Sequence, residues 1–147
     1  MLWARLYSDL QPYLTERRAD GRVLLGFFHR QLADEVRSRY LAGETARARH
    51  GELARYFARQ PLQLSGADGQ APNLRKLSEL PYQQANAGLW DGLYATLTDF
   101  RFLQAKATWA DVDTGADDAG RPVETHSGVY ALQDDFDLAL ALWPEQT

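Results

Sequence analysis

The clearest pattern in this sequence is a change of hydrophobic period near its thirtieth residue. Residues 23–28 read Val-Leu-Leu-Gly-Phe-Phe, an apolar run interrupted by a single glycine, which predicts a short buried strand. From His29 onward the apolar residues recur at helical spacing, as Leu32, Val36 and Tyr40, and charged residues fill the opposite face. The sequence therefore predicts a strand that runs directly into an amphipathic helix, with His29 at the junction.

This junction makes His29 and Arg30 candidate ligand-contact residues. The first amides of a helix have no partner inside the helix, so a helix N-terminus can bind an anion such as phosphate. Both side chains stand where they can reach those amides or an anion bound to them. His29 and Arg30 are therefore our candidate phosphate-contact residues.

The pattern around this junction predicts further helices. Residues 2–14 carry leucines at helical spacing, and Pro12 either kinks that helix or ends it. Asp20-Gly21 is a turn signal before the strand, for which we find no evident partner in the chain. A third helix is expected from about residue 44 to residue 60, where Pro61 ends it.

Residues 61–72 form the most obvious linker, because they are rich in glycine, proline and small polar residues. They divide the chain into residues 1–60, which hold the predicted strand, and residues 73–147, which we expect to be all helical.

The second part begins with Asn73, a good N-cap for a helix that Pro81 kinks or splits and that Gly88 ends. One long or two short helices follow as far as residue 107. Residues 108–128 are polar and predict a loop, and a last helix is expected from about residue 129 to residue 143. Helices joined by a tight glycine turn form helical hairpins, as in tetratricopeptide repeats, although no fixed-period repeat is present.

The predicted fold class is therefore mainly α: a segment with one or two short strands, followed by tetratricopeptide-like helical hairpins. The 147 residues are 45% hydrophobic and contain no cysteine, so the chain can bury a core without disulfides or thiolate metal sites. We find neither an apolar run long enough to span a membrane nor the layout of a signal peptide, and we expect a cytoplasmic protein without membrane contacts.

Charge is unevenly distributed along the chain. Residues 1–60 contain eleven arginines and seven acidic residues, a net charge of +4, whereas residues 61–147 carry −8. The basic part could meet an anionic partner or the acidic part of the same or another copy. We favour pairing within the chain or between subunits over nucleic acid.

Known catalytic and metal-binding patterns are absent from the sequence. There is no phosphate-binding loop, no dinucleotide fingerprint and no His-Glu-x-x-His motif, so we expect no cofactor. A zinc site or metal-assisted hydrolytic site could use His29, His50 or His126 only if separate segments brought them together, with acidic residues such as Asp34, Glu52 or Glu124.

Four stretches together resemble one known arrangement: Leu24–Tyr40, His50–Phe57, Leu77–Asp91 and Phe102–Lys106. They are similar to the region that follows the nucleotidase core in signal-transducing ATPases of the NACHT/NB-ARC (STAND) class, those with trailing WD40 or tetratricopeptide repeats.

The resemblance implies that residues 1–60 are the end of a winged-helix domain and that residues 73–147 are a helical domain. In that family a histidine at the strand-to-helix junction of the winged helix contacts the β-phosphate of bound ADP, and His29 is similar in position. Plant members have Met before this histidine and Asp after it, where this chain has Phe28 and Arg30. The ATPase core and the sensor repeats have no counterpart here, so we expect a piece of the larger arrangement.

These observations favour a non-catalytic regulatory or scaffolding fragment that acts through protein–protein contacts, with the parent ATPase domain as one partner. Two alternatives remain open: a hydrolase with metal-assisted activity, and a winged-helix nucleic-acid binder. We also expect a homodimer, because the strand lacks a partner and because the resemblance implies that the first helix packs on helices that precede it. The predicted interface residues are Leu2, Trp3, Leu6, Tyr7 and Phe27.

Overall fold

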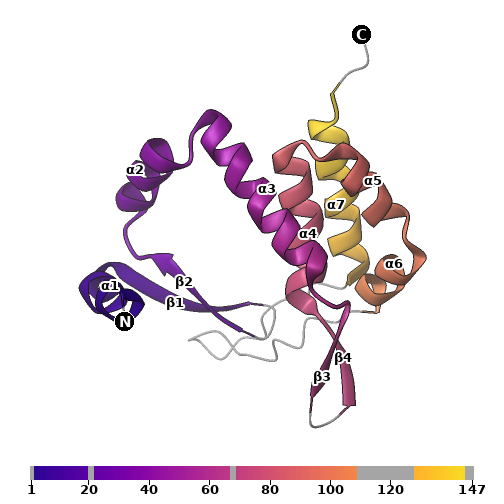
Figure 1. The fold of residues 1–147 in the computed structure, drawn as a ribbon, viewed down its shortest axis with the longest axis horizontal. Helices are drawn as coiled ribbons and strands as arrows, with labels where there is room; N and C mark the ends of the chain where they lie inside the picture. Colours follow the sequence, from indigo (N-terminus) through magenta and orange to yellow (C-terminus); the bar gives the residue numbers. More distant parts are fainter. Residues whose placement is uncertain (1, 20–21, 67–68, 109–127, 145–147) are drawn as a thin grey trace.

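The computed structural model describes residues 2–19, 22–66, 69–108 and 128–144, and it is mainly helical (Figure 1). The expected mainly α fold with a few short strands is confirmed. The helices are α1 (Leu2–Leu10), α2 (Arg30–Tyr40), α3 (Gly43–Arg59), α4 (Leu74–Ala87), α5 (Trp90–Thr98), α6 (Phe100–Ala107) and α7 (Gly128–Leu142), with a 3-10 turn, η1 (Gln11–Tyr13), after α1. The loop predicted at residues 108–128 lies almost wholly outside the described residues.

The predicted strand is present as β2 (Arg22–Phe27), but the expectation that it has no partner in the chain is wrong. It pairs antiparallel with β1 (Leu14–Ala19), and Ala19 stands opposite Arg22 in the register. Charged residues make up half of β1, so its sequence, Leu-Thr-Glu-Arg-Arg-Ala, hides the strand pattern. The Asp-Gly dipeptide between the strands is a turn signal that is also typical of a two-residue hairpin connection.

A second hairpin occupies the segment that we expected to be a linker. Its strands, β3 (Gln63–Gly66) and β4 (Gly69–Pro72), pair antiparallel, and the hairpin extends from one end of the helical bundle (Figure 1). The residues of β4 are exposed, which explains why no hydrophobic alternation marks them in the sequence. The division at residues 61–72 into two domains stays a prediction.

The core lies among the helices of the second half and α3. Phe57 of α3, Leu77 and Leu80 of α4, and Phe102 of α6 form one buried cluster. A second cluster joins α4, α5 and α7; its members are Ala85, Leu93, Leu97 and Ala139. Helix α4 contributes to both clusters, so it is the central element of the bundle.

Helix α4 runs without a break through Pro81, which we had expected to kink or split it. Asn73 caps its start, where its side chain accepts a hydrogen bond from the amide of Lys76 at 3.3 Å. Gly88 ends it with φ of +69°, a left-handed conformation that favours glycine. Pro81 has no amide hydrogen, so the carbonyl of Leu77, four residues earlier, has no donor within the helix.

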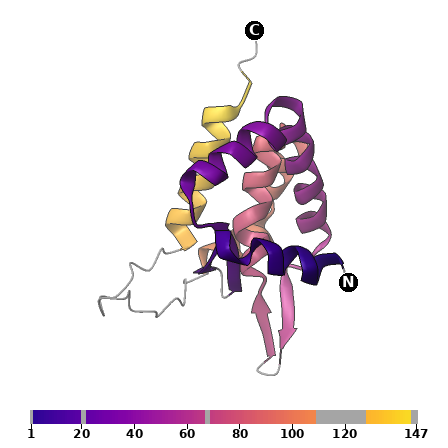
Figure 2. The ribbon, with the colours of Figure 1, turned by 90° about the vertical axis from the view of Figure 1, so that its left-hand side faces the viewer.

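The segment before α3 is packed quite differently from the bundle. Among the described side chains of residues 4–50, none is buried. Helix α1, the β1–β2 hairpin and α2 lie together on one side of α3 (Figures 1 and 2). Their large apolar side chains are exposed to solvent; these are Leu6, Tyr13, Val23, Leu25, Phe28 and Tyr40. This segment therefore presents apolar surface without a core of its own.

Candidate functional site

His29 occupies the expected position at the start of α2. It is the N-cap residue of that helix, in an extended conformation, and its side chain makes no capping hydrogen bond. Its ring packs edge-on against Phe28, with ring centroids 4.9 Å apart, and remains exposed. Arg30 pairs with Asp34 at 3.5 Å and is 94% exposed. Both candidate phosphate-contact residues are thus accessible at a helix N-terminus, but the assignment itself stays a prediction.

His50 takes part in a set of hydrogen bonds between α3 and α4. Its Nδ1 atom lies 2.6 Å from Oε1 of Gln83, and Gln83 donates from Nε2 to Glu79 at 2.7 Å. Because Oε1 of Gln83 can only accept, Nδ1 of His50 is the donor. Glu79 also pairs with Arg75 at 2.8 Å. This row of polar groups connects α3 with α4, which gives His50 a role in helix packing.

The predicted metal candidates do not come together in the part of the chain that the structure describes. His29 is the N-cap residue of α2, His50 lies within α3, and His126 is outside the described residues. Within those residues, no group of three histidine, aspartate or glutamate side chains could hold a metal ion. Asp34 and Glu52 instead pair with nearby arginines, Asp34 with Arg30 and Arg37, and Glu52 with Arg49.

A buried ion pair that the sequence analysis missed lies between α6 and α7. The ammonium group of Lys106, in a residue only 1% exposed, contacts the carboxylate of Asp135 and donates to the carbonyl of Leu77 at 2.9 Å. Pro81 leaves this carbonyl without a donor inside α4, and Lys106 of α6 supplies the missing hydrogen bond. Burial raises the pKa of the Asp135 carboxyl to about 6, and Lys106 acts in the opposite direction.

The pair was recognisable only in part from the sequence. Lys106 is four residues after Phe102, so both lie on the buried face of α6, where an unpaired lysine would be unfavourable. That spacing signals a buried partner but does not say which acidic residue supplies it. Asp134, Asp135 and Asp137 are alternatives in α7, and only the three-dimensional packing selects Asp135.

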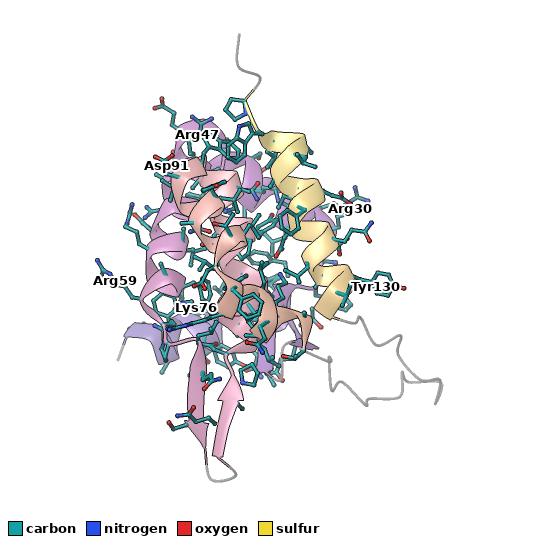
Figure 3. The ribbon with its side chains drawn as sticks, turned by 90° about the vertical axis from the view of Figure 1, so that its right-hand side faces the viewer. Arg30, Arg47, Arg59, Lys76, Asp91 and Tyr130 are labelled. Carbon is teal, nitrogen blue, oxygen red and sulfur yellow. The ribbon has the colours of Figure 1, made fainter. Side chains whose placement is uncertain are left out.

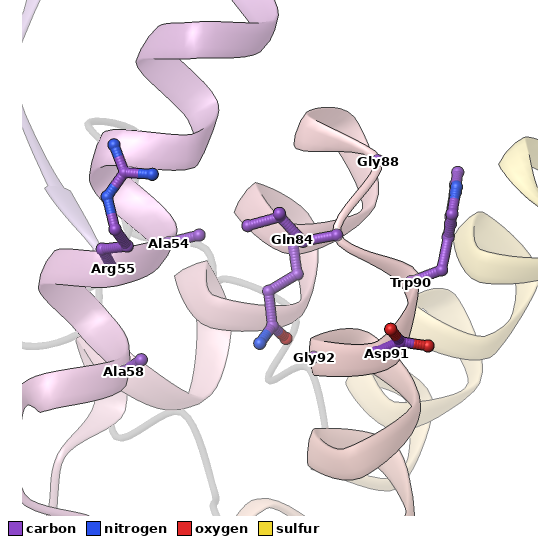
Figure 4. Close-up of a pocket in the computed structure, with 9 residues that line it drawn as sticks. Ala54, Arg55, Ala58, Gln84, Gly88, Trp90, Asp91 and Gly92 are labelled. Atoms are coloured by element: carbon purple, nitrogen blue, oxygen red, sulfur yellow. The ribbon is translucent and has the colours of Figure 1, made fainter.

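A pocket of about 400 Å³ opens between α3, α4 and α5 (Figure 4). Small residues of α3 and the α4–α5 turn form its wall. Arg55 and Asp91, which carry opposite charges, also line it. Gln84, which is 7% exposed, has a buried carboxamide oxygen without a hydrogen-bond partner. A methyl group at Gly92 would come within 3.1 Å of the nitrogen of that carboxamide, so any larger residue at this position would require the Gln84 side chain to shift.

The basic side chains of α3 are mostly solvated. Arg47 and Arg59 project away from the bundle (Figure 3), and Arg49 pairs with Glu52 at 2.7 Å on the same helix. Lys76 has a different role, because its ammonium group donates to the carbonyls of Ala58 and Gln60 at the end of α3. Burial lowers the pKa of Lys76, and Asp99 opposes that shift.

The predicted interface residues are only partly described. Leu6 is 47% exposed, and Tyr7 and Phe27 are half-buried. The side chains of Leu2 and Trp3 lie outside the described part of the chain. Among the described helices, none is long and apolar enough to cross a membrane.

Relatives are found among large NACHT proteins. This chain is 38% identical to NACHT domain- and WD repeat-containing protein 1 of Homo sapiens over 112 aligned positions, which cover 60% of the chain. The corresponding Mus musculus protein is 36% identical over the same share. The chain spans about 7% of the length of either relative. No family model and no solved structure matches it. The comparisons therefore support a relationship to a NACHT-containing protein.

Proposed function

We propose that this chain is a non-catalytic regulatory or scaffolding segment of a STAND-type (NACHT) ATPase system and acts through protein–protein contacts. The observation that carries the proposal is the uncovered apolar surface of residues 4–41, whose described side chains include none that is buried. A two-stranded hairpin is marginal in water unless another layer packs on it. The α3–α7 bundle has its own core, so the surface of α1, β1, β2 and α2 is the part that needs a partner.

The order of elements in the first part agrees with the end of a winged-helix domain. Helix α1 is followed by an antiparallel hairpin, β1–β2, and then by α2 with His29 at its start. In the larger arrangement that the relatives represent, the missing layer over the hairpin would come from the polypeptide next to the ATPase core. Within the described residues, no group of three histidine, aspartate or glutamate side chains could hold the metal ion of the metal-assisted hydrolase alternative.

Site-specific photo-crosslinking in cells that make the protein tests this function. A benzoylphenylalanine replaces Leu25, which is 43% exposed on β2, and the matched control carries it at Tyr94, which is 64% exposed on α5 of the bundle. We expect the Leu25 probe to give a protein adduct whose peptides belong to a NACHT-type ATPase or to a second copy of this chain. An adduct yield equal to that of the Tyr94 probe would overturn the proposal.

A further inference from the structure

The pocket of about 400 Å³ between α3, α4 and α5 has a neighbour. A second pocket, of about 280 Å³, lies farther along the same helices, and Ala58 of α3 and Gln84 of α4 line both pockets. Because they share these two residues, the pockets form one elongated groove, which we call the α4 groove. Its shape suits an extended chain better than a compact small molecule.

Gln84 lies where the two pockets meet and carries an unused hydrogen-bonding group. The residue is 7% exposed, and its carboxamide oxygen has no hydrogen-bond partner among the described residues. Buried polar groups are nearly always hydrogen-bonded, and an orphaned one lowers stability. The terminal torsion of glutamine is broad, and the oxygen has no bond to lose when the carboxamide turns into the groove. A ligand that offers an N–H donor there would satisfy it.

The chemistry of the groove matches a peptide backbone. A primary carboxamide presents an acceptor beside a donor, which complements the N–H and C=O groups of a peptide residue. Residues with little or no side chain let a second backbone approach closely. The groove is rich in such residues, which are Ala54, Ala58, Gly88, Gly92 and Ala95.

The spacing of the two pockets also fits an extended peptide. Gly92 lines the first pocket and Thr96, one helical turn later on α5, lines the second. Four residues of a helix span about 6 Å at 1.5 Å per residue, and alternate side chains of an extended chain are about 6.6 Å apart. Side chains i and i+2 of one peptide can therefore enter the two pockets. Side chain i+2 should be apolar, because the second pocket is lined by Leu62, Leu80 and Phe102.

Opposite charges flank the first pocket. Arg55 lies on the α3 side of Gln84 and Asp91 on the α5 side (Figure 4), and both residues are exposed. Neither has an ion-pair partner among the described residues. Walls of opposite charge favour a ligand of low net charge and disfavour a strongly acidic one such as nucleic acid.

We propose that the α4 groove binds an extended segment of a partner protein. The peptide group between side chains i and i+2 bonds to the Gln84 carboxamide, and the apolar side chain i+2 fills the second pocket. The segment has a low net charge. This contact lies on the helical bundle, apart from the surface of residues 4–41, so it goes beyond the function proposed above and is tested independently of it.

A phage-displayed library of random octapeptides, selected on the full chain, tests the groove. Counter-selection uses Gln84→Met, which keeps the length of the side chain but removes the carboxamide. The matched control is Gln104→Met, because Gln104 is exposed on α6 and lines neither pocket of the groove. By fluorescence polarisation, selected peptides should bind wild type and Gln104→Met equally and Gln84→Met about tenfold more weakly. A library that yields no peptide with this preference would overturn the proposal.

Two further variants of the measurement separate recognition from folding. The thermal unfolding midpoint of Gln84→Met should equal or exceed that of wild type, because the substitution removes an orphaned buried oxygen. Ala58→Trp fills the groove from an exposed position and should abolish binding while the circular dichroism spectrum is kept. A lowered midpoint for Gln84→Met, or undiminished binding by Ala58→Trp, would overturn the proposal.

Methylation of the peptide backbone identifies the bond to Gln84. A methyl group on the nitrogen between side chains i and i+2 removes the donor, so it should weaken binding to wild type about tenfold. The same methylated peptide should bind Gln84→Met no more weakly than it binds wild type, since the bond is already absent. Losses that simply add would contradict a bond between this N–H group and Gln84 and would overturn the proposal.

Discussion

Replacing Lys106 by methionine should destabilise the bundle strongly. Methionine keeps the length of the side chain but removes the charge, so the Asp135 carboxylate loses its ion pair and the Leu77 carbonyl loses its donor. Removing one partner of a buried ion pair typically costs about 3–5 kcal/mol. That is a large share of the roughly 5–15 kcal/mol that stabilises a typical domain.

Two further substitutions separate the two parts of this loss, the unpaired Asp135 carboxylate and the unsatisfied Leu77 carbonyl. Asp135→Leu is nearly isosteric, and in the double variant with Lys106→Met no charge remains buried, so the double variant should be more stable than Lys106→Met alone. Pro81→Ala supplies an amide hydrogen to the Leu77 carbonyl four residues earlier. It should therefore reduce the cost of Lys106→Met by about 1 kcal/mol, the penalty of an unsatisfied buried acceptor.

Urea unfolding at pH 7, followed by circular dichroism, measures these differences as free energies of unfolding. The control is Arg47→Met, which removes a charge from a side chain that projects away from the bundle (Figure 3) and should cost at most about 0.5 kcal/mol. A loss below about 1 kcal/mol for Lys106→Met would refute the reasoning, since exposed ion pairs are worth that much.

Three other outcomes are expected. Burial raises the pKa of Asp135 to about 6 from 3.8, so the folded state binds this proton more tightly than the unfolded state does. The stability that protonation of Asp135 contributes is therefore complete below pH 3.8 and is lost as pH rises through 6. Relative to Asp135→Asn, the wild-type free energy of unfolding should fall by up to about 3 kcal/mol between pH 4 and pH 7. Gly88→Ala should lower the free energy of unfolding by about 1–2 kcal/mol, because a left-handed φ of +69° is strained for alanine. Calorimetry should detect no micromolar binding of ATP by the isolated chain, since no phosphate-binding loop is present; stoichiometric binding, or ATP turnover that disappears in His29→Ala, would contradict that expectation.

Local rules predicted the elements whose ends carry their own signals. Asn73 and Gly88 mark the two ends of α4 through a side-chain cap and a left-handed turn, and both act within a few residues of sequence. Strand β2 was also found from a local pattern, an apolar run that only Gly26 interrupts. Strand β1 was missed because half of its residues are charged and only the pairing with β2 defines it.

The features that depend on tertiary contacts could not be predicted. Lys106 and Asp135 are 29 residues apart in sequence, as are Lys106 and Leu77, so no periodic pattern connects them. Pro81 looked like a helix breaker because the donor that satisfies the freed carbonyl comes from another helix. For the candidate site, the position of His29 at a helix start was predictable, but the packing role of His50 through Gln83 and Glu79 was not.

Hydrogen exchange of the backbone amides, measured by mass spectrometry over a range of protein concentrations, tests the central claim most directly. That claim is that α4 belongs to a self-sufficient core and that β2 is stable only when a partner covers it. At the lowest concentration, where the chain has no partner, the amides of α4 should exchange slowly and those of β2 rapidly. Protection of β2 equal to that of α4 in the dilute monomer would contradict the account.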